Sequence, residues 1–304
     1  MGYRCVVLVK QVPDTKKVTG KAMNDDGTVN RAALPAIFNP EDLNALESAL
    51  RIRERYGGTV TVITMGAPAA CDVLRDALYR GADRVILMTD RRAAGSDTLA
   101  TSHILSCAVK HQGEFDLVIC GRQAIDGDTA QVGPQCAEKL GIPQITYVEA
   151  DVELNDRTIR ARRGVGNGWE TLEGPLPVLL TVTAEANVPR PPAARRIMRC
   201  KRARAPIEMR REIDEADPDA PDDQKQAAVE KRCEELKANG LLIEQVGLDD
   251  VSADLDWVGL RGSPTWVNRI QTIVLTGSGY KSVEPTDEGV AAMVHELIED
   301  HTIG

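Results

Sequence analysis

The stretch at residues 118–134 combines glycine, acidic and amide side chains in an order that suits the binding of an anion. An apolar run over residues 115–120 predicts a buried strand that stops at Gly121, and a helical pattern resumes through Ala137 and Leu140. A strand that turns at a glycine into a helix presents unpaired backbone N–H groups above the sheet edge. This central stretch therefore predicts a pocket for a phosphate or pyrophosphate group.

Three residues of the central stretch have expected roles in such a pocket. Asp126 or Asp128 could cap the new helix through a carboxylate oxygen. Gly127 would let the backbone turn sharply or approach a ligand closely. The alternative interpretation is a capped strand–helix loop that binds no ligand.

Other residue types that carry chemistry show no useful spacing. The seven cysteines include no CxxC pair, and the four histidines form no metal-ligand pattern, which is typical of a reduced cytosolic protein. No GxGxxG follows the first apolar run, and GxxxxGK[ST], GxSxG and HExxH motifs do not occur. The sequence therefore predicts no catalytic residue and no metal site.

Composition narrows the class of protein further. The net charge of −9 and the pI of about 5.1 argue against a general nucleic-acid binder, and 3% aromatic residues leave little for base stacking. No apolar run approaches the roughly 20 residues that a membrane span needs, and residues 3–9 are too short for a signal peptide. We expect a cytoplasmic protein with no membrane span and no nucleic-acid partner.

The elements that must position the central stretch alternate along the chain. Apolar runs predict strands at residues 4–10, 59–64, 84–88, 115–120, 144–148 and 177–182, with helices between the first five. Such alternation requires a parallel twisted sheet with helices on both faces, a Rossmann-like α/β fold. Ligands of open sheets of this kind bind beyond the carboxyl ends of the strands.

Several loops begin at that edge of the predicted sheet. They follow Lys10, residues 65–66 and Gly121, and the helix that starts near Asn39 could reach the same edge. Asn39 suits an N-cap, the proline after it suits the first helical position, and the next two acids favour the positive helix end. Four segments are thus expected to converge on one crevice.

Composition changes sharply after the sixth strand. Residues 184–204 carry a proline-rich motif at 189–192 and then a basic cluster of Arg195, Arg196, Arg199, Lys201, Arg202 and Arg204. The cluster could be a solvated face, or it could dock an acidic partner by electrostatic steering. Nucleic acid is the third choice.

The chain is expected to divide into three regions. Residues 1–205 form an α/β nucleotide-binding domain with a hairpin near 150–174, and residues 206–240 form an acidic linker (212–223) and an inserted helix. Residues 241–304 are turn-rich, carry an exposed-looking Trp266, and end in an amphipathic helix at 286–300. Apolar residues without a periodic core usually complete their burial on another subunit, so this region is expected to be an arm.

The central stretch closely resembles the signature loop of the beta subunit of electron transfer flavoprotein. Residues 9–13, 39–42, 81–83 and 197–198 match the same family in order. The resemblance covers about residues 1–210 and resumes in the C-terminal arm.

This resemblance implies a heterodimer with an alpha subunit that carries an FAD and that packs on the arm at 241–304. It also implies that an adenine nucleotide lies in the beta-subunit crevice. The implied cofactor-binding residues are Leu8, Asn39, Pro40, Glu41, Asp42, Met65, Gly121, Arg122, Gln123, Ala124, Ile125, Asp126, Gly127, Asp128, Thr129, Ala130, Gln131 and Val132.

The resemblance also implies partners. The family's docking loop for acyl-CoA dehydrogenases maps to residues 187–199, where Ala194 replaces a leucine anchor, so an ordinary acyl-CoA dehydrogenase is not implied. Gly127 directly after Asp126, together with residues 259–265, resembles the electron-bifurcating branch. That branch binds a second FAD where other members hold AMP, accepts hydride from NADH, and passes electrons to the alpha-subunit FAD and to ferredoxin or flavodoxin. The alternatives are a non-bifurcating beta subunit with AMP and a non-redox nucleotide-binding regulatory module.

Overall fold

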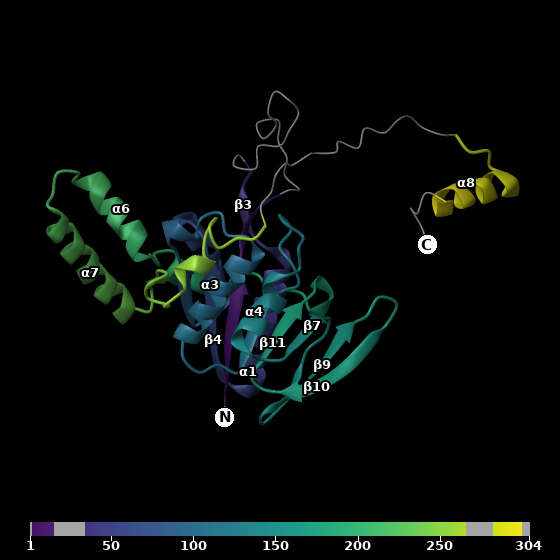
Figure 1. The fold of residues 1–304 in the computed structure, drawn as a ribbon, viewed down its shortest axis with the longest axis horizontal. Helices are drawn as coiled ribbons and strands as arrows, with labels where there is room; N and C mark the ends of the chain where they lie inside the picture. Colours follow the sequence, from purple (N-terminus) through teal and green to yellow (C-terminus); the bar gives the residue numbers. More distant parts are fainter. Residues whose placement is uncertain (1, 15–33, 266–281, 300–304) are drawn as a thin grey trace. The chain divides into compact units, whose positions relative to one another are not determined.

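The computed structural model describes residues 2–14, 34–265 and 282–299 (Figure 1). The chain forms two compact units, residues 1–267 and residues 268–304. The first unit contains the sheet, and helix α8 (Asp287–Glu299) belongs to the second. Trp266, expected from the sequence to be exposed, lies outside the described residues.

Within the described residues, ten strands form one sheet in the order β10-β9-β7-β11-β6-β1-β4-β5-β12, with β8 paired to β9. The strands from β7 to β12 in this order are parallel, and β8, β9 and β10 add an antiparallel extension at one side. Their bounds are β1 (Tyr3–Val9), β4 (Gly58–Met65), β5 (Arg84–Met88), β6 (Leu117–Gly121), β7 (Gln144–Val148), β8 (Glu153–Asn155), β9 (Thr158–Gly164), β10 (Trp169–Pro175), β11 (Val178–Val182) and β12 (Glu244–Val246). A separate two-stranded sheet pairs β2 (Gln11–Pro13) with β3 (Ala36–Phe38).

Helices cover both faces of the sheet, as the sequence predicts. Helices α1 (Pro40–Tyr56) and α2 (Cys71–Arg80) contribute to the core on one face, and α3 (Thr98–His111) and α4 (Val132–Leu140) to the core on the other. Strand β1 serves both layers, because successive side chains of a strand point to opposite faces: Val7 lies in the first core, and Val6 and Leu8 in the second. The predicted α/β class is confirmed.

The strand order reverses between β1 and β6. From β1 the chain adds β4 and β5 on one side, and it then returns to place β6 on the other side of β1. The connections that leave the carboxyl ends of β1 and β6 lead to helices on opposite faces of the sheet, and ligands of open α/β sheets bind at such a point. We call the loops that follow β1, β4 and β6, together with the start of α1, the switch-point rim.

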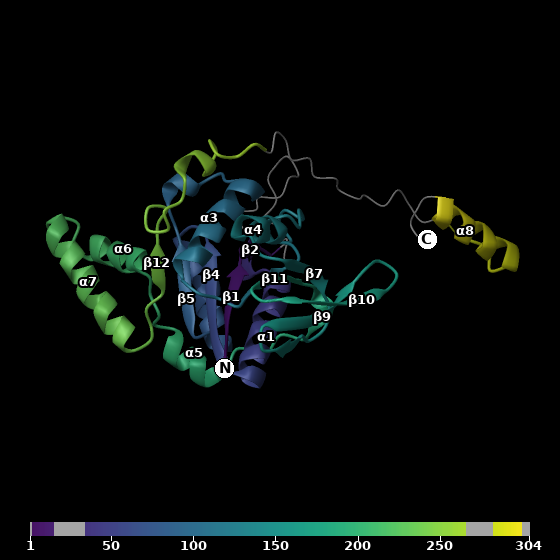
Figure 2. The same cartoon turned by 60° about the horizontal axis from the view of Figure 1, so that its bottom comes forward.

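The region predicted as a linker with one helix forms two helices instead. Helix α6 (Pro206–Ala216) and helix α7 (Asp222–Ala238) pack side by side beyond the β12 edge, away from the β9–β10 hairpin (Figures 1 and 2). The acidic, proline-containing composition indicated flexibility, but Pro206 suits the first helical turn, and Glu208 accepts a bond from the Ala205 N–H. Residues 212–216 belong to α6 and residues 222–223 to α7, so the linker prediction for residues 212–223 is wrong at both ends.

Much of the predicted C-terminal arm also belongs to the first unit. Strand β12 pairs in parallel with β5, and Ile243 and Leu248 beside it are fully buried. The following turns pack against the start of α3, where the Gly259 N–H donates to Ser96 Oγ and the Thr265 N–H to Asp97 Oδ2. Several apolar side chains of residues 241–265 are thus buried on their own subunit, whereas Leu255, Trp257 and Leu260 are exposed, and the packing of this region on an alpha subunit stays a prediction.

Helix α8 remains a candidate for the predicted arm. Its apolar residues Val290, Met293, Val294 and Ile298 recur at helical spacing, and all four side chains are exposed. Its packing on another subunit stays a prediction. No helix among the described residues is long and apolar enough to cross a membrane.

Candidate functional site

The switch-point rim brings together segments that are far apart in the sequence. Lys10, directly after β1, donates through Nζ to the Asp126 carboxylate at 2.8 Å, which joins the loop after β1 to the loop after β6. The Gln11 side chain donates to the Ala69 carbonyl in the loop after β4. The start of α1 lies at the same edge, since the Asn39 N–H donates to the Lys10 carbonyl. The four predicted segments therefore do meet.

Asn39 precedes α1, as predicted, but its side chain does not cap the helix. Its amide Nδ2 donates to the Gln123 carbonyl at 2.9 Å, and its Oδ1 accepts from the Ile125 N–H at 3.1 Å. The side chain is fully buried. The N-cap prediction is thus wrong about the side-chain bond: Asn39 holds the central loop rather than the first turn of α1.

The next two acids also bond the central loop. Asp42 accepts from the Gly121 N–H at 2.9 Å through Oδ1 and from the Lys10 N–H at 2.8 Å through Oδ2. Glu41 accepts from the Gln123 N–H at 3.0 Å and pairs with the Arg122 guanidinium at 3.0 Å. Side chains at the start of α1 therefore occupy N–H groups that the sequence predicted to be free for an anion.

Burial makes these carboxyl groups unusual acids. Burial raises the pKa of Asp42 to about 7, against the opposing effect of its bonds from the Lys10 and Gly121 N–H groups. Burial also raises the pKa of Glu41, opposed by the Gln123 N–H and by Arg122. Because Asp42 bonds the ends of both β1 and β6, its protonation state bears on the spacing of the two loops.

The predicted cap of α4 is also wrong. The helix begins at Val132, with Gln131 at the N-cap position and no side-chain cap bond among the described residues. Asp126 pairs with Lys10 instead, and Asp128 accepts from the Gln123 side chain at 3.0 Å. The two acids stiffen the loop and leave the helix start open.

The open helix start is the part of the rim that suits an anion. Within the described residues, the N–H groups of Thr129, Ala130 and Gln131 have no hydrogen-bond partner. Asp128 and Ala130 adopt left-handed backbone conformations, with φ of 49° and 53°. Consecutive free N–H groups beside left-handed residues are a backbone pattern that can bind an anion, and the helix dipole adds positive potential. Strained backbone of this kind is concentrated at functional sites.

The glycines of the loop divide into two kinds. A Cβ on Gly121 would lie 2.5 Å from Asp42 Oδ1 and 2.9 Å from the Asp42 backbone nitrogen, so only glycine permits the close approach of α1. A Cβ on Gly127 would meet no atom within 4 Å, and its N–H donates to the Ala124 carbonyl. Gly121 is required by the fold, whereas Gly127 leaves open space beside the helix start.

The remaining predicted binding residues lie at different depths. Leu8 is buried in the core against α3 and α4, and Met65 is half-buried at the end of β4. Pro40 is exposed at the first position of α1. Gln131 is exposed and accepts from Thr98 Oγ1, while Ala124, Ile125 and Val132 are half-buried. Leu8 therefore supports the site through the core.

Sequence reasoning missed two further residues near the rim. Lys10 forms the ion pair with Asp126 that joins the loops after β1 and β6. Tyr147, at the end of β7, lies under the Arg122 guanidinium at 5.7 Å from its ring centre, and Arg122 Nε is buried without a partner among the described residues. The position of Lys10 directly after the first strand could have identified it from the sequence, but no sequence pattern indicated Tyr147.

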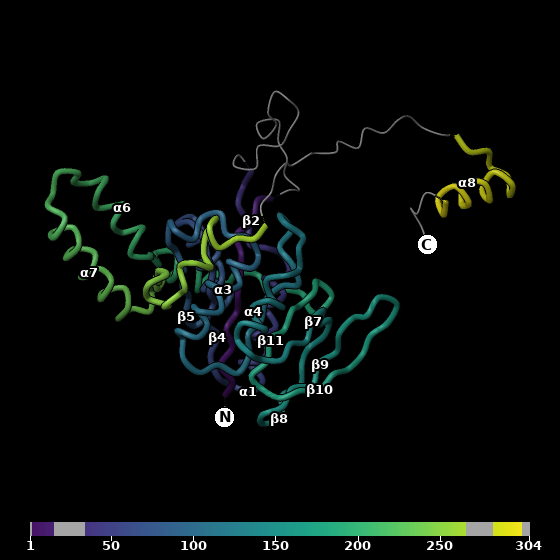
Figure 3. The backbone as a smooth tube through the Cα atoms, viewed as in Figure 1, coloured from purple at the N-terminus to yellow at the C-terminus, as the bar shows by residue number. Residues whose placement is uncertain are grey.

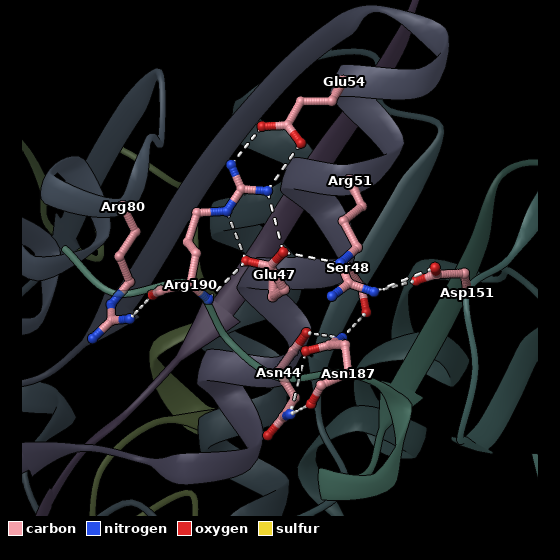
Figure 4. A network of polar contacts seen from close by, with 9 residues as sticks. All are labelled: Asn44, Glu47, Ser48, Arg51, Glu54, Arg80, Asp151, Asn187 and Arg190. Carbon is pink, nitrogen blue, oxygen red and sulfur yellow. Dashed lines mark hydrogen bonds and ion pairs between the residues drawn. The ribbon is translucent and has the colours of Figure 1, made fainter. Parts of the chain in front are cut away.

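The predicted docking stretch at 187–199 has two structural parts. Residues 187–193 lie along α1: Asn187 bonds Asn44 and Ser48, and Arg190 bonds Glu47 at 2.7 Å (Figure 4). Although burial opposes ionisation, bonds from Arg190 and Arg51 hold the pKa of Glu47 below its ordinary value. The second part forms helix α5 (Ala194–Cys200).

The stretch runs from one edge of the sheet to the other. It leaves the carboxyl end of β11, and the Ala193 N–H donates to the Tyr79 carbonyl at the end of α2. Helix α2 ends just before β5 begins, so α5 lies at the amino-terminal edge of the sheet, opposite the switch-point rim.

No group of three or more His, Cys, Asp or Glu side chains in the described part of the chain is placed to hold a metal ion. The chemistry of the rim is instead that of backbone N–H groups, buried carboxylates and two cations. This set can bind and orient an anionic ligand.

The chain is similar to known proteins over most of its length. The family model described as the electron transfer flavoprotein domain matches residues 26–230. An electron transfer flavoprotein subunit beta from Clostridium acetobutylicum is 41% identical over 298 residues, 98% of this chain and 99% of that protein. The acryloyl-CoA reductase electron transfer subunit gamma from Anaerotignum propionicum is 38% identical over 305 residues, 99% of this chain and 100% of that protein.

A shorter match is stronger in identity. Subunit CarD of the caffeyl-CoA reductase-Etf complex from Acetobacterium woodii is 48% identical over 188 residues, 62% of this chain and 71% of that protein. Taken with the parallel sheet and the loop at its switch point, these matches show that the chain belongs to the electron transfer flavoprotein family, as a relative of its beta subunits.

Proposed function

We propose that the switch-point rim binds an adenine nucleotide, with a phosphate group on the open start of α4. The observation that carries the proposal is the run of unpartnered N–H groups at Thr129, Ala130 and Gln131. The open space beside Gly127 would admit the phosphate chain. Hydrogen bonds with the side chains of Asn39, Glu41 and Asp42 hold residues 121–125 of the central loop in place.

The full set of proposed binding residues is the one that the family resemblance implies. Residues 127–132 would face the ligand, residues 121–126 would form the loop that carries them, and residues 39–42, Leu8 and Met65 would support it from the neighbouring elements. Among these groups, the N–H groups of Thr129, Ala130 and Gln131, just before α4, are the ones whose geometry supports direct contact with a phosphate.

We further propose that the nucleotide is FAD and that the complex bifurcates electrons. Gly127 after Asp126 and residues 259–265, which pack on the start of α3, support this reading. Two relatives named for acryloyl-CoA reductase and for a caffeyl-CoA reductase-Etf complex favour it as well. When bound, the flavin would supply hydride acceptance from NADH and the onward transfer of single electrons.

The proposed function requires partners. An alpha subunit with its own FAD would receive electrons from this chain and cover the exposed apolar residues of α8, such as Met293 and Ile298. Ferredoxin or flavodoxin would take the other electron. A dehydrogenase would dock at residues 187–199, whose second part, α5, presents exposed basic side chains.

The deciding experiment is a cofactor count on the purified heterodimer. We expect two flavins per heterodimer, no AMP, and bleaching of the flavin absorbance on addition of NADH. One FAD with one AMP, and no reaction with NADH, would instead identify a non-bifurcating beta subunit. A colourless chain that purifies alone with an adenine nucleotide would favour the regulatory module.

A further inference from the structure

The helix α5 and the turn after it carry charge without counter-charge. Arg195, Arg196, Arg199, Lys201 and Arg202 form no ion pair with any residue that the structure describes. We call residues 195–202 the basic segment. The chain as a whole carries an excess of nine acidic charges, so acids were available to pair with these cations.

The basic residues that flank the segment, in contrast, form ion pairs within the chain. Arg190 pairs with Glu47 and Glu54, and Arg204 pairs with Glu212 at 3.1 Å. Between them Met198 exposes 66% of its surface, at the centre of the unpaired cations. A central apolar side chain within a charged rim is the usual anatomy of a protein–protein contact.

The helical hairpin α6–α7 is fixed beside the basic segment. At its base, the Arg204 N–H donates to the Leu241 carbonyl and the Ile243 N–H to the Arg204 carbonyl. Arg75 on α2 holds Glu208 on α6 at 3.0 Å, and the Arg199 side chain donates to the Asn239 carbonyl. The hairpin therefore has a defined position relative to α5, and Figure 3 shows it projecting beyond β5.

A cleft of about 300 Å³ lies between the hairpin and the end of the basic segment. It is lined by Arg202, Arg204, Glu212, Arg232, Glu235 and Leu236. Glu212 is shared, because Arg204 and Arg232 both pair with it at 3.1 Å. One carboxylate thus serves two guanidinium groups, and Arg202 adds a cation that has no ion pair within the described chain.

We propose that the basic segment and the α6–α7 hairpin form one composite docking cleft for an acidic protein partner. The cleft is lined by three arginines and two glutamates, and a carboxylate of the partner would enter between Arg202 and Arg232 and supply the missing counter-charge. Met198 and Leu236 would contact apolar side chains beside it. The identity of the partner as an electron-exchanging dehydrogenase rests on the proposed function.

The surface favours a protein partner over a nucleic acid. The cleft lining contains no aromatic side chain on which a base could stack, and Glu212 and Glu235 lie beside the arginines. The tip of the hairpin is acidic, with Asp217, Asp219 and Asp223 exposed, so the positive charge is confined to the cleft and the basic segment and does not continue along the hairpin as an extended phosphate backbone would require.

The test measures binding of a short fluorescein-labelled peptide of glutamate and leucine to the purified heterodimer, by fluorescence anisotropy. Reversing both cleft arginines, Arg202→Glu with Arg232→Glu, should weaken binding about tenfold, because two attractive charges become repulsive. Lys231→Glu makes the same single charge reversal as Arg232→Glu one residue away, outside the cleft lining, and should weaken binding less than about twofold. Urea unfolding of each variant confirms that it is folded.

Three results would overturn the proposal. They are a cleft variant that binds as well as the Lys231 variant, a glutamine–leucine peptide that binds as tightly as the glutamate peptide, and single-stranded RNA that binds more tightly than either. The nucleotide content of the same samples is measured separately. Loss of acidic-peptide binding with the nucleotide present, or the reverse, shows which of the two proposals has failed.

Discussion

The switch-point rim and the basic segment are both rich in charge, and they lie at opposite edges of the same sheet. At the rim every carboxylate of the α1 start is bonded: Asp42 to two backbone N–H groups and Glu41 to one N–H and one guanidinium. In the basic segment five cations are exposed and have no ion pair within the described chain.

The difference follows from burial. An unpaired charge is costly inside a protein, so the buried acids of the rim must be satisfied internally, and they fix one loop shape. An exposed cation is hydrated at little cost and remains available to a partner. The rim is thus preorganised for a small anion, whereas the basic segment gains its counter-charges only on association. The following predictions test this contrast, from the largest expected effect to the smallest.

Gly121→Ala should give the largest effect. Its Cβ would lie within 3 Å of Asp42 Oδ1 and of backbone atoms of Glu41 and Asp42, so α1 and the loop must separate. We expect the free energy of unfolding to fall by about 3 kcal/mol in urea titrations, and the nucleotide to be lost. The control is Gly127→Ala, whose Cβ meets no atom within 4 Å and should change stability by less than about 0.5 kcal/mol.

The position of Gly127 gives a sharper comparison. Gly127→Val should leave the unfolding curve nearly unchanged and still reduce the nucleotide content, because the larger side chain would occupy the space beside the phosphate. Full nucleotide content in this variant would remove Gly127 from the proposed site.

Asp42→Asn should have the next largest effect. The amide can accept one of the two N–H bonds but presents a donor to the other, which leaves the Lys10 or Gly121 N–H unsatisfied. We expect a loss of about 2 kcal/mol of unfolding free energy and weaker nucleotide retention. Asp128→Asn keeps an acceptor for the Gln123 amide at an exposed position and should leave the unfolding free energy unchanged, so equal losses of unfolding free energy in the two variants would contradict the role of Asp42 in joining the two loops.

Asp42 should also make stability depend on pH. Its pKa is about 7 in the folded chain and near its ordinary value of 3.8 when unfolded, so the folded state holds the extra proton between these values. Stability from this group therefore falls as pH rises through that window, by at most about 1.4 kcal/mol per pH unit, and is constant above it. Unfolding free energies of wild type and Asp42→Asn should differ more at pH 5.5 than at pH 8; a constant gap would refute this assignment.

Reversal of Arg195, Arg196 and Arg199 to glutamate should have the smallest effect on folding. These side chains make no ion pair in the described chain, so the unfolding free energy should change by less than about 0.5 kcal/mol. Electron transfer to or from a docked dehydrogenase should slow about tenfold and lose its salt dependence, because steering is removed. Unchanged kinetics at low salt would mean that the basic segment is only a solvated face.

Much of the fold could be predicted from local patterns. Apolar runs identified β1, β4, β5, β6, β7 and β11 with small errors at their ends. The predictions that were based on composition and not on periodicity were wrong. The acidic residues of α6 predicted a linker, and the turn-rich composition around β12 predicted no strand. Both elements depend on contacts with distant strands and helices for their stability.

By itself the sequence determined which segments form the sheet, which loops leave its carboxyl edge, and which family's signature lies at the switch point. Only the tertiary structure decided which side chains accept the hydrogen bonds of the N–H groups in that loop. The partners of Gly121, Gln123 and Ile125 are side chains about eighty residues earlier in the chain. Such pairings depend on how α1 packs across β1 and β6, and no local pattern records them. For the same reason the sequence could not tell that Ile243, Leu248 and Val258 are buried on this subunit, since hydrophobicity predicts burial and does not identify the surface that provides it.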